Sequence, residues 1–205
     1  MDSVKEDRRL LTKCLEGDRE ASALFVTRFS GLIYHSVRYT LAVRGIPFTR
    51  QDLEDFHNTI FLRLFEGDCR KLRQYQGKNG CSPASWLRVV AVRIVLNHIR
   101  DSGLKSTLRQ DTPAHFLNLT TSDKEALEPL TLMEQAEQRQ FLRDATKRLS
   151  PRDRLFMKLY FEDGLGIQEV ADALGISIQN AYTVKHRAIQ RLRSHLSNQK
   201  TDPEL

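Results

Sequence analysis

The sequence predicts an all-α protein of two small helical domains joined by a flexible linker, with a helix-turn-helix in the C-terminal domain. Along most of the 205 residues, apolar side chains recur at intervals of three and four residues, which is the period of an amphipathic helix, and no stretch alternates as a β-strand does. Segment 103–133 is rich in Ser, Thr and Pro and loses this period, as a linker does. We therefore expect domains at 1–102 and 134–205, with a linker at 103–133.

Capping residues and glycines divide the first domain into helices. Asp18 and Thr49 are N-cap residues for the second and third helices, and Asp52 places an acid near the positive end of the third. Ser82-Pro83 starts the fourth, because a capping hydroxyl followed by proline favours the first helical turn. The predicted helices span 3–16, 19–44, 49–65 and 83–100, with a loop at 76–82.

The second domain is predicted to hold four short helices, of which the last two form a helix-turn-helix. The first of the four spans 138–149, and the second starts at Ser150-Pro151. In the pair that follows, Ala171 is small where the helices cross, Gly175 supplies a left-handed turn residue and Ser177 caps the second helix. The buried stripe of that last helix is predicted to be Ala181, Val184 and Ala188.

The exposed face of the last helix favours DNA binding. No acidic residue occurs from Ser177 to Lys200, and the face carries donors, acceptors and cations that can read base edges and bind phosphates. The alternative is the solvated face of a small helical bundle. The candidate residues are Ser177, Gln179, Asn180, Tyr182, Thr183, Lys185, His186, Arg187 and Arg191.

A second candidate site surrounds the single tryptophan, Trp86. An indole face beside cations and a polar loop suits unstacked, single-stranded bases, whereas the alternative is that Trp86 fills the core. The candidate residues are Lys78, Asn79, Trp86, Arg88, Arg93, Asn97 and Arg100.

The helix at 49–65 presents acids beside apolar residues, which would repel DNA and suits a basic protein partner. Its candidate partner-binding residues are Asp52, Glu54, Asp55, Asn58, Phe61 and Leu62. The formal net charge is +6, yet the acids are segregated from the basic helices, so the distribution favours two different partners, one of them anionic.

Three stretches together resemble a bacterial RNA polymerase sigma factor of the extracytoplasmic-function (ECF) group. They are Leu53–Leu64, Ser85–Arg100, and Leu149–Gly164 running into the helix-turn-helix. The resemblance implies that the first stretch docks on core RNA polymerase, the second melts and holds the downstream promoter element, and the last helix reads the upstream element as a duplex. It implies core polymerase and promoter DNA as partners, with an anti-sigma factor as a further candidate. The residues at Asn180–Val184 depart from the family's usual ones, so the promoter sequence is not predicted.

Other classes of protein fit less well. A stand-alone helix-turn-helix regulator that never engages polymerase is the main alternative. Metal-dependent chemistry on nucleic acid would need ligands from among His57, Cys69, Cys81 and His98, whose spacing is not that of a zinc site. We therefore expect no enzyme activity, metal, cofactor or small-molecule substrate. No apolar run approaches the roughly 20 residues of a membrane span, and the polar N-terminus lacks a signal-peptide core, so a cytoplasmic protein is expected.

Overall fold

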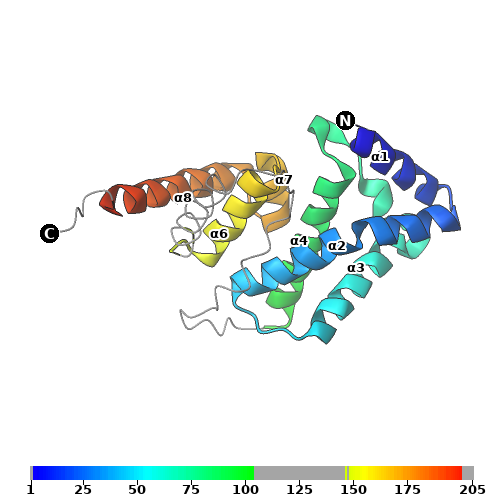
Figure 1. Cartoon of the computed structure of the whole chain (residues 1–205), viewed down its shortest axis with the longest axis horizontal. Helices are drawn as coiled ribbons and strands as arrows, with labels where there is room; N and C mark the ends of the chain where they lie inside the picture. The colour runs from blue at the N-terminus through cyan, green and yellow to red at the C-terminus, as the bar shows by residue number, and fades with distance from the viewer. Residues whose placement is uncertain (1, 104–145, 147, 200–205) are drawn as a thin grey trace, which may run out of the picture.

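The computed structural model describes residues 2–103, 146 and 148–199, and they fold as helices with short connections (Figure 1). The predicted all-α class is confirmed, with no strand among these residues. Apart from Gly103, the predicted linker at 103–133 lies outside the described residues, as does most of the predicted helix at 138–149.

The first domain consists of four helices around one apolar core. They are α1 (Asp2–Leu15), α2 (Arg19–Arg44), α3 (Arg50–Cys69) and α4 (Pro83–Asp101), with 3-10 turns η1 (Leu72–Gln74) and η2 (Lys78–Gly80) between the last two. Figure 1 shows the long α2 crossing the domain beside α3 and α4. The side chains of Phe25, Ile33, Leu64 and Leu87 are all fully buried in this core. Burying each of these large apolar side chains stabilises the folded domain by about 1.5–3 kcal/mol.

The predicted helix starts in this domain are confirmed by their capping hydrogen bonds. The Asp18 carboxylate accepts from the backbone N–H of Ala21 at 3.0 Å. Thr49 and Asp52 form a capping box, in which the Asp52 carboxylate accepts from the Thr49 N–H at 2.6 Å. Ser82 Oγ accepts from the N–H of Ser85 at 3.0 Å at the start of α4. Each bond satisfies a backbone donor that the first helical turn leaves unpaired.

The end of α3 is less regular than the sequence predicts. Its backbone leaves helical angles at Glu66, and Gly67 and Asp68 then adopt left-handed conformations. The Arg73 guanidinium donates to the Asp68 carbonyl at 2.9 Å and to its carboxylate at 2.8 Å. These two bonds hold the turn that leads from α3 towards η1.

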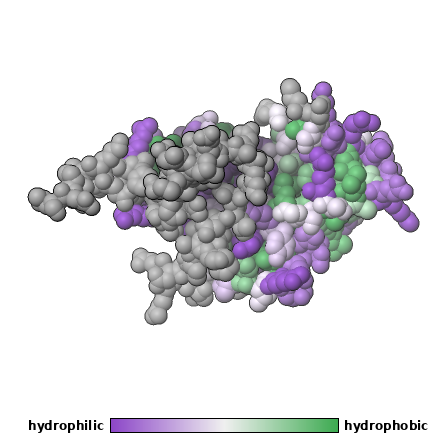
Figure 2. Space-filling model, viewed as in Figure 1, coloured by the Kyte–Doolittle hydropathy of each residue, from purple (hydrophilic) through white to green (hydrophobic). Residues whose placement is uncertain are grey.

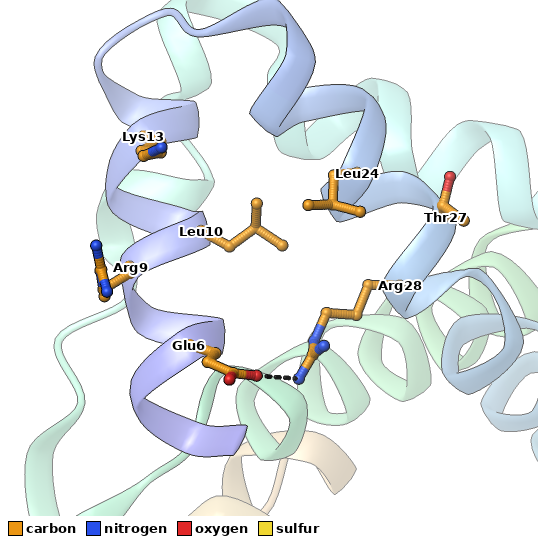
Figure 3. Close-up of a pocket in the computed structure, with 7 residues that line it drawn as sticks. All are labelled: Glu6, Arg9, Leu10, Lys13, Leu24, Thr27 and Arg28. Atoms are coloured by element: carbon orange, nitrogen blue, oxygen red, sulfur yellow. Dashed lines mark ion pairs between the residues drawn. The ribbon is translucent and has the colours of Figure 1, made fainter. Parts of the chain in front are cut away.

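A shallow apolar groove separates α1 from α2, and Figure 3 shows Leu10 and Leu24 facing each other across it. At one end, the Arg28 guanidinium reaches from α2 to α1, where it pairs with Asp7 and lies 3.8 Å from Glu6. The space-filling view shows hydrophobic areas of the first domain bordered by hydrophilic residues (Figure 2). Asp7 is buried, so Arg28 compensates a carboxylate that water scarcely reaches.

Replacing Arg28 with Met is expected to lower the free energy of unfolding by about 1–3 kcal/mol, because the buried Asp7 carboxylate loses its guanidinium donor. Urea unfolding followed by circular dichroism measures the change. The matched control is Arg9→Met, since Arg9 lines the same groove but is exposed; it should change stability by less than about 0.5 kcal/mol. Equal effects of the two substitutions would contradict the role given to Arg28.

The second domain places its helix-turn-helix against a short supporting helix. This helix, α6 (Pro151–Met157), continues as a π-helical turn, η4 (Lys158–Glu162). The helix-turn-helix is α7 (Ile167–Leu174) and α8 (Ile178–Gln199), joined at Gly175 with φ 64°. The prediction of short helices here is wrong for α8, which has 22 residues, because no glycine or proline interrupts the sequence from Ile178 to Gln199.

The two domains pack together in this structure, which the sequence did not predict. A second apolar cluster joins Val43 of α2 and Val89 and Val92 of α4 to residues of the second domain, among them Leu155 and Phe156 of α6. In Figure 1, α6 and α7 accordingly lie beside α4 and one end of α2. None of the helices in the part of the chain that the structure describes is long and apolar enough to cross a membrane.

Candidate nucleic-acid and polymerase interfaces

The helix-turn-helix presents the polar face of α8 to solvent. Ala181, Val184 and Ala188 are buried, as predicted, so the opposite face of α8 points outwards. Ser177 Oγ caps α8 by accepting from the N–H of Asn180 at 3.2 Å. The exposed residues of this face are Ser177, Gln179, Asn180, Tyr182, Thr183 and His186.

The cations of α8 are held by residues of the preceding helix. Lys185 Nζ donates to the Tyr160 hydroxyl at 2.7 Å and lies 4.1 Å from the centroid of that ring. Arg187 and Arg191 both donate to Asp153, at 2.6 and 3.0 Å, and the hydrogen bond that Arg187 donates to this carboxylate raises the pKa of Arg187. The two arginine side chains keep 45% and 48% of their surface exposed. They therefore fix α8 on α6 and still present guanidinium edges to a phosphate.

Asp153 is the residue of this site that sequence reasoning missed. Its side chain is fully buried and ties two arginines of α8, one helical turn apart, to the first turn of α6. The available signal was an acid directly after the Ser150-Pro151 helix start and a pair of arginines at spacing four. Spacing alone did not reveal that both arginines contact a buried acid of α6.

Replacing Asp153 with Asn is expected to lower the free energy of unfolding by about 2–3 kcal/mol, because a charged acceptor of two guanidinium groups becomes a neutral amide. Thermal unfolding measures the effect. Asp172→Asn is the matched control, since Asp172 is an exposed carboxylate of α7 in the same domain. Its stability should stay near that of the unmodified chain, and a comparable loss in both variants would contradict the role of Asp153.

Trp86 lies at the edge of the first domain's core and packs against it. Its ring is half-buried and meets the Tyr75 ring edge-on at 5.8 Å between centroids. The Tyr75 hydroxyl donates to the Cys81 carbonyl at 2.7 Å and accepts from Arg8 at 3.3 Å. These bonds anchor the two ends of the polar loop beside the indole.

A groove of about 500 Å³ runs between this loop and the second domain. Gln76, Lys78 and Trp86 line one wall, and the N-terminal turn of α7 lines the other. Arg88 points to the second domain and pairs with Asp163 at 3.6 Å. Of the remaining candidates, Arg93 is exposed, Asn97 is half-buried and Arg100 pairs with Asp101. Asn79 lies in η2, and its side chain is outside the part of the chain that the structure describes.

The face of α3 is acidic but less apolar than predicted. Leu62 is 66% exposed, whereas Phe61 is 7% exposed and packs in the core of the first domain. The capping box occupies the Asp52 carboxylate, and the hydrogen bond from the Thr49 backbone lowers its pKa. Glu54 is half-buried and pairs with Arg50 at 2.8 Å. Asp55, Asn58 and Leu62 are therefore the predicted docking residues that this helix presents most freely.

The His and Cys residues weighed as metal ligands have other neighbours. His57 Nε2 lies 2.7 Å from Ser30 Oγ, and the His98 ring meets Phe56 edge-on at 5.0 Å. The three cysteines are free thiols, and Cys14 is buried. Within residues 2–103 and 148–199, no group of three His, Cys, Asp or Glu side chains could hold a metal ion.

Comparison with known proteins identifies the second domain. Residues 145–194 match the family model of sigma-70 region 4. The match covers α6, α7 and most of α8, and it does not extend to the first domain. The match supports the resemblance predicted for the second domain, in which α7 and α8 form the helix-turn-helix.

The chain is also similar in fold to a solved structure. It is similar to CnrH in complex with the cytosolic domain of CnrY, with a TM-score of 0.50 and 19% identity over 94% of this chain and 97% of that chain. It also matches the sigma factor RpoE in complex with the anti-sigma factor NepR from Bartonella quintana, with a TM-score of 0.48 and 14% identity over 87% and 98% of the two chains. No curated protein sequence matches it.

Proposed function

We propose that this chain is a sigma factor, which binds core RNA polymerase and promoter DNA and directs transcription initiation, and that it divides this work between its two domains. The first domain, 1–102, docks on core polymerase and opens the promoter, and the second, 134–205, reads duplex DNA, with 103–133 as the linker. The observation that carries the proposal is the exposed, acid-free face of α8 in a region 4 domain. The protein acts by binding and not by catalysis, and it acts in the cytoplasm, where polymerase meets promoters.

The reading face is assigned to α8. Gln179, Asn180 and Thr183 offer amides and a hydroxyl on one exposed side of the helix, and such groups discriminate base edges in a major groove. Arg187 and Arg191 border them with half-exposed guanidinium groups that suit phosphates. The role of Asp153 in this proposal is to position both arginines.

Promoter opening is assigned to the N-terminal half of α4 and the loop before it. Trp86 borders a groove that also holds Lys78, so a stacking surface and a cation occur together. Arg93 and Arg100 add positive charge along the same helix, which carries no acidic residue from Trp86 to Arg100. Unstacked bases and their phosphates are the ligands that this combination fits.

Polymerase docking is assigned to α3. Asp55 and Asn58 lie near the exposed Leu62, which gives an apolar contact within a polar, acidic surround. Protein interfaces gain most of their binding energy from a few contacts that become buried in the complex. The surrounding charges set the orientation of the partner. An inhibitory protein of the anti-sigma class is a further proposed partner, in line with the fold shared with CnrH, whose structure is a complex with the cytosolic domain of CnrY.

The test is a binding assay with purified core polymerase. The labelled chain should co-migrate with core enzyme in gel filtration, and the complex should make thymines of the downstream element reactive to permanganate on a selected promoter. A stand-alone helix-turn-helix regulator would bind the same duplex without core enzyme and would leave those thymines unreactive. Failure to bind core polymerase would contradict the docking role of α3.

A further inference from the structure

Two large apolar side chains interrupt the polar reading face of α8. Ile178 keeps 43% of its surface exposed and Tyr182 keeps 55%, whereas Gln179, Thr183 and His186 beside them are polar. In the part of the chain that the structure describes, six large apolar side chains are exposed. Two of the six therefore lie in the first turns of one helix, among the residues assigned to DNA reading.

The local backbone fixes the direction of these two side chains. Residues four apart in a helix lie on the same side, so Ile178 and Tyr182 form one apolar stripe. Ser177 Oγ caps the helix directly before Ile178, and the Ala181 N–H donates to the Ser177 carbonyl at 2.9 Å. Because Ala181 and Val184 are buried, α8 cannot rotate to turn the stripe inward without exposing its own core residues.

The stripe has no packing role among the described residues. Neither Ile178 nor Tyr182 belongs to one of the two apolar clusters of that part of the chain. Tyr160 of the same domain offers a contrast, since its hydroxyl accepts from Lys185 at 2.7 Å and its ring packs against the second cluster. Tyr160 thus serves the fold, whereas Tyr182 holds an aromatic ring in solvent on the face assigned to DNA.

The major groove offers one apolar group to such a stripe. Thymine carries a methyl group on C5, and the other groups that base pairs present in this groove are hydrogen-bond donors and acceptors. In a helix-turn-helix, the first residues of the second helix contact base edges. Ile178 and Tyr182 occupy these turns together with Gln179 and Thr183, so all four side chains face the same groove when α8 lies in it.

We propose that Tyr182, with Ile178 beside it, packs on the 5-methyl group of a thymine in the duplex that α8 reads. This inference rests on the proposed reading role of α8. It adds a preference for thymine at a fixed position, next to the base pairs that Gln179 and Thr183 contact. The aromatic ring makes this contact, and the hydroxyl is not needed for it.

Removal of the methyl group from DNA tests the contact directly. The full chain first selects duplexes from a library with a randomised segment, in which we expect thymine at a fixed position. Uracil pairs as thymine does but lacks the methyl group, so uracil at this position should weaken binding about fourfold in fluorescence anisotropy. Uracil at a thymine outside the selected segment should change binding less than twofold. Unchanged affinity at the selected thymine would overturn the proposal.

Substitutions of Tyr182 identify the group that meets the methyl. Tyr182→Ala should bind the thymine duplex about tenfold more weakly and the uracil duplex with the same affinity as the thymine duplex, because the contact is gone. Tyr182→Phe keeps the ring, so it should stay within twofold of the unmodified chain and keep the fourfold effect of uracil. If Tyr182→Phe behaved as Tyr182→Ala does, or if Tyr182→Ala kept the uracil effect, the contact would be wrongly assigned.

Phe161→Ala is the matched control for the position of the aromatic ring. Phe161 is 54% exposed, close to the 55% of Tyr182, but it lies in η4 and not on α8. This variant should keep the effect of uracil, and its loss there would overturn the role of the α8 stripe. If the chain selects no duplex, the reading role of α8 and this inference both fail. If it selects a duplex without any effect of the methyl group, the reading role stands and only this inference fails.

Discussion

Replacing Gln179, Asn180 and Thr183 together with alanine is expected to weaken binding to the upstream duplex element by about 100-fold or more. Each well-placed contact with a base edge contributes about 1–3 kcal/mol of discrimination, and 1.4 kcal/mol corresponds to a factor of about ten. The three side chains are exposed, and the buried stripe of α8 is unchanged by the substitutions, so the domain should stay folded. Anisotropy titration on a duplex that the holoenzyme selects from a library measures the loss.

The comparison variant for this prediction is Arg193→Ala. Arg193 is exposed on α8 and carries a charge that can meet phosphates but not the specificity of an amide. Arg193→Ala should weaken binding to selected and scrambled duplexes equally. It should also lower the slope of the logarithm of the binding constant against the logarithm of the salt concentration by about one. If the triple variant lost affinity equally for both duplexes, α8 would bind DNA without reading it.

Replacing Leu62 with Arg is expected to reduce affinity for core polymerase by about 30-fold or more, which corresponds to the 2 kcal/mol or more of an interface hot spot. The exposed leucine has no role in the core of the first domain, and the new cation opposes the acidic character of the α3 face. Titration of core enzyme with labelled protein measures the change, and circular dichroism verifies the fold.

The chain offers a close control for that experiment. Leu24 of α2 is also an exposed leucine, at 58% against 66% for Leu62, and it lies in the groove between α1 and α2 (Figure 3). Leu24→Arg should leave polymerase affinity within about twofold. A similar loss in the two variants would indicate a general effect of the substitution and would contradict docking through α3.

The sequence predicted the features that depend on neighbouring residues. Helix starts at Asp18, Thr49 and Ser82 follow from capping hydrogen bonds within three residues, and the structure has each of them. The left-handed residue Gly175 and the buried Ala181 follow from the local pattern of a helix-turn-helix. These features need no knowledge of which distant segments meet.

Features that depend on distant contacts were not predicted. Phe61 and Leu62 are adjacent and both apolar, and only the packing of α3 on α2 decides that Phe61 lies inside. Arg187 is a cation on the face predicted to contact DNA, yet its guanidinium donates to the buried Asp153 carboxylate, 34 positions earlier. The valines of α2 and α4 fit the core of their own domain by periodicity, although they pack on the other domain.

The central claim is that this chain brings core RNA polymerase to promoters, and run-off transcription tests it most directly. Core enzyme is incubated with a genomic promoter library, nucleotides and either the unmodified protein, its Leu62→Arg variant or no addition. We expect discrete transcripts with the unmodified protein and much smaller amounts of the same transcripts with the variant. Absence of any transcript that depends on the protein, from a preparation that binds core polymerase and duplex DNA, would contradict it.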